Sequence, residues 1–228
     1  MTKSKTVGIL GGMGPYATVS FFRTLLDLTP AKKDWEHLRL IIDNNPHIPS
    51  RSRYLLYGEE SPVDGMIASC RKLQHYPVDF IVIPCNSACY FLPEVEKHVD
   101  VPILNIVEIT AQSLNLEDGE KVAVFGGTIT HEKETYRKFL EEYGFTYVEH
   151  SDEVQSIVNE IIELIKLNAS NEEVVEKFYD AITELSYIDQ LILGCTELSE
   201  LKYTNDCGFL MVDSTEELAK KTVEIAFS

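Results

Sequence analysis

The chain has 228 residues, enough to bury a full hydrophobic core in one or two domains. Its content of 44% hydrophobic and 25% charged residues is ordinary for a globular protein and disfavours disorder, collagen and coiled coil. The formal charge of -17 would repel nucleic-acid phosphates and anionic membranes, so we expect neither as a partner. Much of the acid lies in helix-like stretches, such as 132–142 and 153–163, which we interpret as solvent-facing.

The compartment can be predicted from the apolar runs and the cysteines. No apolar run approaches the ~20 residues of a membrane span, and residues 1–5 lack the pattern of a signal peptide. We therefore expect a cytoplasmic protein. In that reducing compartment the five cysteines should be free thiols.

Short runs rich in β-branched residues alternate with segments long enough for a helix, which predicts parallel strands in an α/β fold. The expected strands are 7–10, 38–42, 80–83 and 103–107, followed by 122–125, 145–148, 191–193 and 209–212. Helices are expected at 63–76, where Ser61-Pro62 provides a start signal, and from Thr130 to a left-handed Gly144. Further helices are expected at 153–166, from about 171 to 185, and at about 214–227.

The two halves of the chain repeat each other. Residues 78–86 (VDFIVIPCN) align without a gap with 188–196 (IDQLILGCT), and 6–12 (TVGILGG) align with 121–127 (KVAVFGG). The repeat predicts two similar lobes, each a parallel sheet flanked by helices, that present two cysteines to one cleft. We place their boundary in the turn-like stretch 114–120, which gives one lobe of residues 1–113 plus about 214–228 and a second of 114–213. The sequence does not decide on which lobe the last helix packs.

A glycine-rich loop, Gly11-Gly12-Met13-Gly14-Pro15, follows the first expected strand. Its backbone N–H groups and the start of the next helix can hold an anion, either a carboxylate or a dinucleotide pyrophosphate. The dinucleotide interpretation would use Asp43 for the ribose, but Pro15 and the long spacing to Asp43 weaken it. A turn used only for packing remains open.

A second loop, Asn-Asn-Pro-His-Ile-Pro-Ser-Arg at 44–51, follows the second expected strand. Ligands bind at this end of the strands in open α/β sheets, and the two prolines stiffen the loop. Arg51 is therefore placed to form a forked pair with a carboxylate, although a lone arginine is more often a surface charge.

The cysteines divide into two kinds. Cys70 and Cys207 are interpreted as structural, because a buried thiol packs as a small hydrophobe. Cys85 and Cys195 occupy the same point of the repeat and are followed by hydrogen-bonding residues, so we interpret them as functional. The one-turn spacing Cys85-x-x-x-Cys89 suits a metal chelate, but a structural zinc site wants four ligands and the sequence offers no second pair, so we predict no metal. A redox motif normally has two residues between its cysteines.

At these residues the chain resembles the cofactor-independent aspartate/glutamate racemase family. The shared motifs are Gly-Gly-Met-Gly-Pro-x-Ala-Thr, Asn-x-Pro-x-Ile-Pro-x-Arg, Pro-Cys-Asn-Ser-Ala and Gly-Cys-Thr-Glu-Leu, in family order. The resemblance implies two pseudo-symmetric lobes with the active site between them, a homodimer, and racemisation without pyridoxal phosphate. It implies Cys85 and Cys195 as the thiols on the two faces of the substrate α-carbon. It also implies substrate-binding positions at Met13, Arg51, Asn86, Ser87, Lys166 and Thr196.

Three positions depart from the family pattern. Cys89 and Asn105 stand where many members have histidine, and Ser50 stands where an aspartate is expected before Arg51. These replacements leave both thiols intact and bear on the choice of substrate.

The predicted function is therefore racemisation of aspartate, or of glutamate, by two-base proton transfer between the thiols. A related isomerase or racemase acting on another small carboxylate, such as maleate, is the first alternative. An NAD-binding oxidoreductase and a non-catalytic amino-acid-binding protein are alternatives from other classes.

Overall fold

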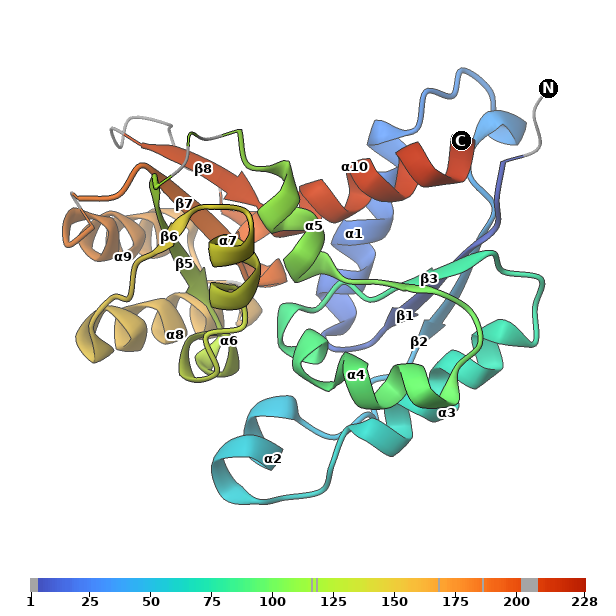
Figure 1. Cartoon of the computed structure of the whole chain (residues 1–228), viewed down its shortest axis with the longest axis horizontal. Coiled ribbons are helices and arrows are strands. Elements are labelled where there is room, and N and C mark those ends of the chain that lie inside the picture. Colours follow the sequence, from blue (N-terminus) through green and yellow to red (C-terminus); the bar gives the residue numbers. More distant parts are fainter. Residues whose placement is uncertain (1–3, 116, 118, 168, 186, 202–208) are drawn as a thin grey trace.

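The computed structural model describes residues 4–115, 117, 119–167, 169–185, 187–201 and 209–228. Two four-stranded parallel sheets form its centre, with strand orders β2-β1-β3-β4 and β6-β5-β7-β8. Each order places the third strand of its half next to the first. The predicted α/β class and the two similar sheets are confirmed, and Figure 1 shows each sheet with its own helices around it.

The first sheet consists of β1 (Val7–Gly11), β2 (Leu40–Asn44), β3 (Phe80–Val82) and β4 (Ile103–Leu104). The helices in this half are α1 (Pro15–Leu28), α2 (Arg51–Tyr57), α3 (Val63–Gln74), α4 (Leu92–Val95) and α5 (Ile106–Ser113). Short 3-10 helices are η1 (Asp34–Glu36), η2 (Asn86–Phe91) and η3 (Glu96–His98).

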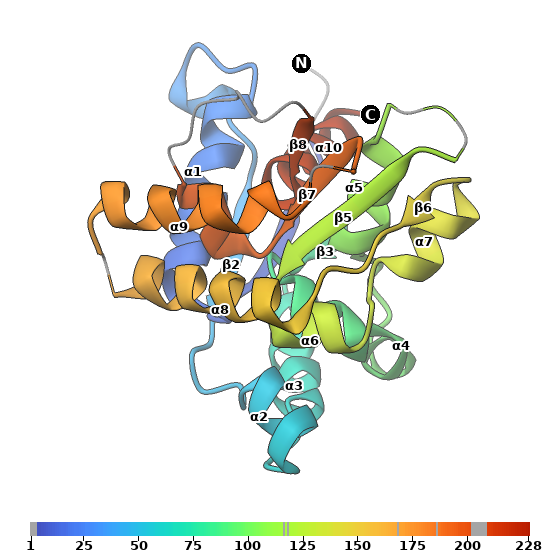
Figure 2. The ribbon, with the colours of Figure 1, turned by 90° about the vertical axis from the view of Figure 1, so that its left-hand side faces the viewer.

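The second sheet consists of β5 (Lys121–Gly126), β6 (Thr146–Tyr147), β7 (Gln190–Gly194) and β8 (Leu210–Asp213). Its helices are α6 (Thr128–Glu132), α7 (Arg137–Glu142), α8 (Asp152–Lys166), α9 (Asn171–Thr183) and the 3-10 helix η4 (Thr196–Glu200). Helices α8 and α9 pack side by side over this sheet, in front of it in Figure 2. The last helix, α10 (Ser214–Phe227), packs mainly against α1 and α5 (Figure 1).

The repeat is visible in equivalent hydrogen bonds at the start of the central strands. Thr6 N–H donates to Asp79 Oδ2 at 2.6 Å, and Lys121 N–H donates to Asp189 Oδ2 at 2.7 Å. These four residues occupy matching positions of the two aligned segments. Asp79 and Asp189 therefore have the same role in the two halves: Asp79 connects the start of β3 to that of β1, and Asp189 connects the start of β7 to that of β5.

Several expected elements differ from the structure by one or two residues at their ends, and two were wrong by more. The strand predicted at 103–107 ends at Leu104, because the Asn105 side chain accepts a hydrogen bond from Val107 N–H at 3.0 Å and caps α5. The helix predicted from Thr130 is divided into α6 and α7, and Glu134 between them has φ 43°. Gly144 has φ 87°, as expected for the left-handed residue after a helix.

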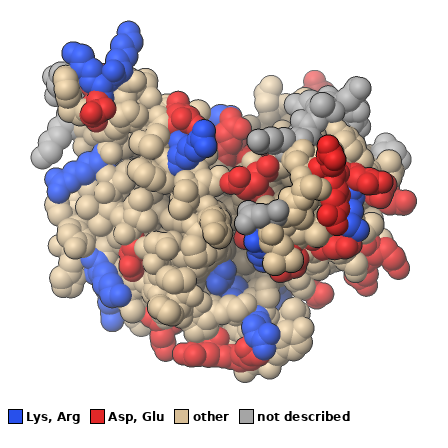
Figure 3. Space-filling view, turned by 180° about the vertical axis from the view of Figure 1, so that it is seen from behind, with Lys and Arg blue, Asp and Glu red and all other residues tan. Residues whose placement is uncertain are grey.

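The central strands are fully buried, and every residue of β1 and β7 is shielded from solvent. Their ends are therefore held rigidly, which fixes the loops that follow them. Acidic side chains gather over the second half of the molecule in Figure 3. Helices α8 and α9 contribute exposed carboxylates to this half, namely Asp152, Glu153, Glu160, Glu163, Glu172, Glu173, Glu176 and Asp180. Within the described part of the chain, no helix combines the length and the apolar character that crossing a bilayer requires.

Candidate active site

Cys85 lies three residues past the end of β3 and directly before η2, and its side chain is buried. Its sulfur is 4.0 Å from Nη2 of Arg51, which also donates to the carbonyl of Met13 at 2.9 Å. Arg51 is the first residue of α2, where the cap residue Ser50 accepts a hydrogen bond from Arg53 N–H. A guanidinium at this distance stabilises negative charge that develops on the sulfur.

The glycine loop and the Asn44–Arg51 segment meet because Gly12 has no side chain. Gly12 has φ 92°, and a Cβ there would lie 2.3 Å from the backbone carbon of Asn45. Only glycine permits both the conformation and the contact. The contact brings Met13 and Arg51 together, so the two predicted binding loops of the first half form one structure.

Cys195 follows β7 directly and precedes η4, in the position that Cys85 holds in the first half. Its thiol donates to Oε2 of Glu197 at 3.0 Å. Burial, followed by the Glu197 carboxylate, raises the pKa of Cys195 well above its usual range, and the charge of Cys85 adds to this. Cys85 is thus close enough to Cys195 for its charge to act on the second thiol.

Ser87 and Glu197, which lie two positions after Cys85 and Cys195, each contact the opposite half of the chain. A Cβ built on Gly14 would lie 3.8 Å from Oε1 of Glu197, and one built on Gly127 would lie 3.9 Å from Oγ of Ser87. The turn after Cys195 therefore packs against the glycine loop of the first half, at Gly14. The turn after Cys85 packs against the equivalent loop of the second half, at Gly127. This exchange places both thiols at the junction of the two sheets.

Asn86 joins the halves through its side chain. Its Nδ2 donates to Ser214 Oγ at 3.0 Å, and its Oδ1 accepts from the Tyr136 hydroxyl at 2.5 Å. Burial raises the pKa of Tyr136 far above its usual range, so the hydroxyl keeps the proton that it donates. The amide of Asn86 is therefore engaged with partners from the second half and α10, and a role in substrate binding stays a prediction.

The two remaining predicted positions of the second half lie beside Glu197. Thr196 is buried, and its hydroxyl donates to Glu197 Oε2 at 3.4 Å. Lys166 forms an ion pair with Glu163 at 2.7 Å. Burial lowers the pKa of Lys166, but the hydrogen bond to Glu163 and the charges of Glu197, Glu163 and Cys195 outweigh it and raise that pKa. Lys166 is thus near the second thiol while it is bound to a carboxylate of its own helix.

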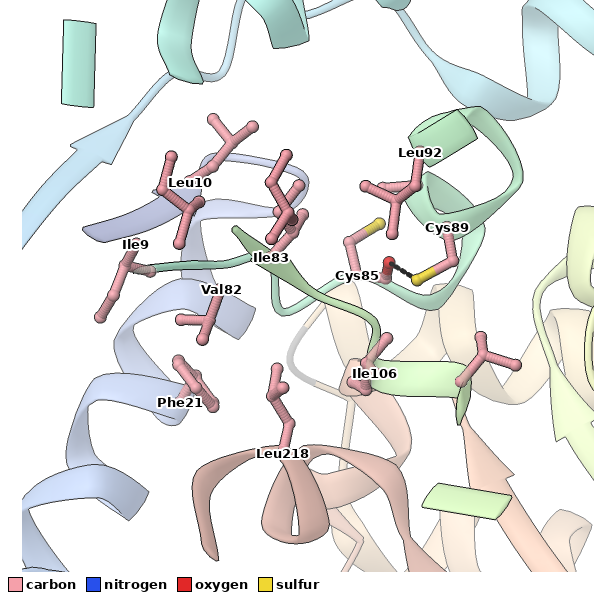
Figure 4. Packing of buried hydrophobic residues seen from close by; sticks show 14 of the residues in the cluster. Ile9, Leu10, Phe21, Val82, Ile83, Cys85, Cys89, Leu92, Ile106 and Leu218 are labelled. Atoms are coloured by element: carbon pink, nitrogen blue, oxygen red, sulfur yellow. Dashed lines mark hydrogen bonds between the residues drawn. The ribbon is translucent and has the colours of Figure 1, made fainter. Parts of the chain in front are cut away.

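Two other cysteines are held as inert thiols. The Cys89 thiol donates to the Cys85 carbonyl at 3.9 Å, the contact that Figure 4 marks with a dashed line. Burial is the main cause that raises the pKa of both Cys89 and Cys70 to about 12. The structural interpretation of Cys70 agrees with this burial, whereas Cys207 lies outside the described residues. The four described cysteines are free thiols.

A cavity of about 630 Å³ opens beside the second thiol. Its wall comes from the start of α1, the ends of α8 and η4 and the start of α9, and includes Gly14, Arg23, Lys166, Glu197 and Glu200. Neither Cys85 nor Cys195 is part of this wall. Glu197 faces the cavity and also accepts the Cys195 hydrogen bond, so it stands between the cavity and the sulfur.

Two residues of this site, Tyr136 and Glu197, were not among the predicted site positions. Tyr136 reaches Asn86 from a turn in the second half, whereas the amphipathic pattern after Thr130 indicates only that its ring is buried. Glu197 had a signal, because it is the carboxylate at the repeat position where the first half has Ser87. Among the residues that the structure describes, no group of three or more histidine, cysteine, aspartate or glutamate side chains is arranged to hold a metal ion.

The sequence profile of the Asp/Glu/Hydantoin racemase family matches residues 10–222. The broad specificity amino-acid racemase RacX of Bacillus subtilis is 30% identical over 224 residues, which cover 95% of this chain and 96% of RacX. A glutamate racemase of Histophilus somni strain 2336 is 23% identical over 172 residues, 72% of this chain and 63% of that protein.

Solved structures give the same result. The aspartate racemase of Picrophilus torridus superposes with a TM-score of 0.86 at 30% identity and covers 97% of this chain and 94% of that one. An aspartate racemase homologue from Pyrococcus horikoshii superposes with a TM-score of 0.78 at 25% identity, over 98% of this chain and all of that one (100%). The chain therefore belongs to the Asp/Glu/Hydantoin racemase family of amino-acid racemases.

Proposed function

We propose that this chain racemises an acidic amino acid, aspartate first, without pyridoxal phosphate, by proton transfer between Cys85 and Cys195. Inversion of a stereocentre needs a base on one face of the α-carbon and an acid on the other, with the roles exchanged in the reverse direction. Two thiols at equivalent strand ends of a repeated fold meet this requirement. The equivalent placement of Cys85 and Cys195, each in a turn that packs against the glycine residues of the opposite half, is the observation that carries the proposal.

The charges around Cys85 support a carboxylate substrate. Arg51 combines a contact to the Cys85 sulfur with a buried Nε atom that has no hydrogen-bond partner. A substrate carboxylate that pairs with this guanidinium would hold the α-carbon next to the sulfur. The same guanidinium would stabilise the negative charge that forms as the α-proton leaves.

The substrate range is the second part of the proposal. The RacX relative has broad specificity by name, and the cavity of about 630 Å³ beside Cys195 offers room for side chains longer than that of aspartate. A broad-specificity racemase is therefore the second candidate. Aspartate remains the first because the Picrophilus torridus structure is that of an aspartate racemase.

The test is exchange of the α-proton in heavy water, followed by NMR, with a panel of L- and D-amino acids that includes aspartate, glutamate, lysine and alanine. Loss of the α-proton signal together with appearance of the other enantiomer on chiral chromatography supports the proposal. Turnover of aspartate alone identifies an aspartate racemase, and turnover across the panel identifies a broad-specificity enzyme. Absence of exchange with every amino acid, by a folded protein, would contradict the proposal.

The predicted homodimer is proposed together with this activity, as are the lobe boundaries of 1–113 with about 214–228, and 114–213. Sedimentation velocity at several protein concentrations measures the oligomeric state directly. A single monomer species at all concentrations would contradict the dimer without affecting the racemase proposal.

A further inference from the structure

The two halves of the site differ in charge at one matched position. Ser87 and Glu197 each lie two residues after a cysteine, and each packs against the glycine loop of the opposite half. The backbone arrangement is shared, yet one half presents a hydroxyl and the other a carboxylate. The repeat that supplies two equivalent thiols therefore gives them unequal electrostatic environments.

Glu197 contacts the second thiol directly. Its Oε2 is 3.0 Å from Cys195 Sγ and also accepts the Thr196 hydroxyl at 3.4 Å. An ionised carboxylate can only accept hydrogen bonds, so the Cys195 sulfur must supply the proton of this contact. A thiolate at the same place would set two negative groups within hydrogen-bond distance of each other in a buried site.

Charged groups on the neighbouring elements reinforce the difference. Lys166 approaches Cys195 and Glu197 from α8, but its ammonium is bound by Glu163 at 2.7 Å. Cys85 adds a further negative charge when it ionises. Arg51, in contrast, is 4.0 Å from the Cys85 sulfur. Positive charge thus lies beside Cys85, and negative charge lies beside Cys195.

We infer that Glu197 is a positioning residue that keeps Cys195 protonated between turnovers, so that Cys195 is the proton donor of the resting site and Cys85 is left to act as the base. The inference rests on the proposed racemase function and adds an assignment of roles. In a turnover from this state, Cys85 removes the α-proton and Cys195 donates its proton to the opposite face. The site is left with a Cys85 thiol and a Cys195 thiolate beside Glu197. Repulsion between these two negative groups favours return of a proton to Cys195.

The experiment compares Glu197→Gln with Glu200→Gln. Glu200 lies in the same 3-10 helix and the same cavity wall, so it is the matched control for removing a carboxylate. Both changes are made in Cys85→Ser protein, and ultraviolet thiolate absorbance is titrated against pH. The same titration of a Cys85→Ser/Cys195→Ser variant is subtracted, which leaves the signal of Cys195. Circular dichroism verifies folding.

Glu197→Gln is expected to increase the ratio of thiolate to thiol at Cys195 by roughly tenfold or more at a given pH, because a neighbouring like charge typically shifts an ionisation by one unit or more. Glu200→Gln should leave this ratio as it is in the parent. Glu197→Asp, which keeps the charge, should restore most of the parental behaviour. An unchanged Cys195 titration in Glu197→Gln would overturn the inference.

This readout is independent of turnover. If Glu197→Gln shifts the Cys195 titration while the parent protein exchanges no amino-acid proton, the role of Glu197 stands and the racemase proposal fails. If the parent racemises and the titration does not respond to Glu197→Gln, the racemase proposal stands and the inference fails.

Discussion

The hydroxyl of Tyr136 donates a 2.5 Å hydrogen bond to Asn86, which joins the turn after the first cysteine to the second half of the chain. Tyr136 is completely buried and Asn86 nearly so. Asn86, which follows Cys85 in the chain, is therefore fixed by a residue from the second half, at the start of α7. Its loss should affect stability and site geometry together.

Tyr136→Phe is expected to lower the free energy of unfolding by about 1–3 kcal/mol, because it leaves the buried Asn86 Oδ1 without this donor. Urea denaturation measures the change. Tyr143→Phe is the control, since it removes an exposed hydroxyl that accepts from Gln112, and should cost less than about 0.5 kcal/mol. Equal effects of the two substitutions would show that the buried hydrogen bond contributes no more to the free energy of unfolding than the exposed one.

Single replacement of either thiol should separate proton exchange from inversion. Cys85→Ser and Cys195→Ser are each expected to reduce racemisation by roughly 100-fold to 10,000-fold, the usual contribution of a positioned acid or base. The remaining thiol can still remove and return a proton on its own face, so the two variants should exchange opposite enantiomers in heavy water without inverting them. NMR with chiral analysis measures both processes. Full racemisation by either variant would exclude the two-thiol mechanism.

Arg51→Lys should impair the site although it keeps the charge. The guanidinium of Arg51 contacts both the Met13 carbonyl and the Cys85 sulfur, and an ammonium cannot reproduce its planar fork. We expect kcat/KM to fall by at least about tenfold, with folding unchanged by circular dichroism. Arg53→Lys in the same helix is the control, since Arg53 pairs with the exposed Glu59. Wild-type kinetics in Arg51→Lys would remove Arg51 from the proposed substrate contacts.

Gly126→Ala should destabilise the second half. A Cβ at this position would lie 2.5 Å from Thr130 Cγ2, so the β-branched side chain has to move, at a cost of roughly 1–3 kcal/mol. Gly127→Ala is the adjacent control, because the nearest atom to its Cβ would be 3.9 Å away and its φ is -65°. Thermal unfolding of both variants measures the difference. The prediction fails if the two variants unfold at the same temperature.

Protonation of His150 should lower the free energy of unfolding as the pH falls below about 6.5, which is the ordinary pKa of histidine. Burial lowers the pKa of His150, so the unfolded chain takes up a proton that the folded protein resists. The unfolded state then binds more protons, and the free energy of unfolding falls with pH from there. Urea denaturation across this range should show a shallower pH dependence in His150→Gln than in the parent or in the exposed control His75→Gln. Parallel curves would contradict the assignment.

Local sequence determined the elements that depend on periodicity and on single backbone requirements. The strand ends at Cys85 and Cys195, the buried face of α8 and the left-handed Gly144 follow from patterns within a few residues. The repeat added the two matching sheets, because a duplicated segment folds under the same constraints in both copies. The errors, at 103–107 and after Thr130, arose where a side-chain cap or a backbone turn outweighed the hydrophobic pattern.

The tertiary structure alone decided which residues meet. The turn after each catalytic candidate cysteine contacts the opposite half of the chain. The contacts are Tyr136 with Asn86, Glu197 with Gly14, and Ser87 with Gly127. No sequence spacing encodes such contacts, since they depend on how the two sheets pack against each other. For the same reason the sequence supplied two equivalent thiols, while the difference in charge around them emerged only when the side chains of both halves came together.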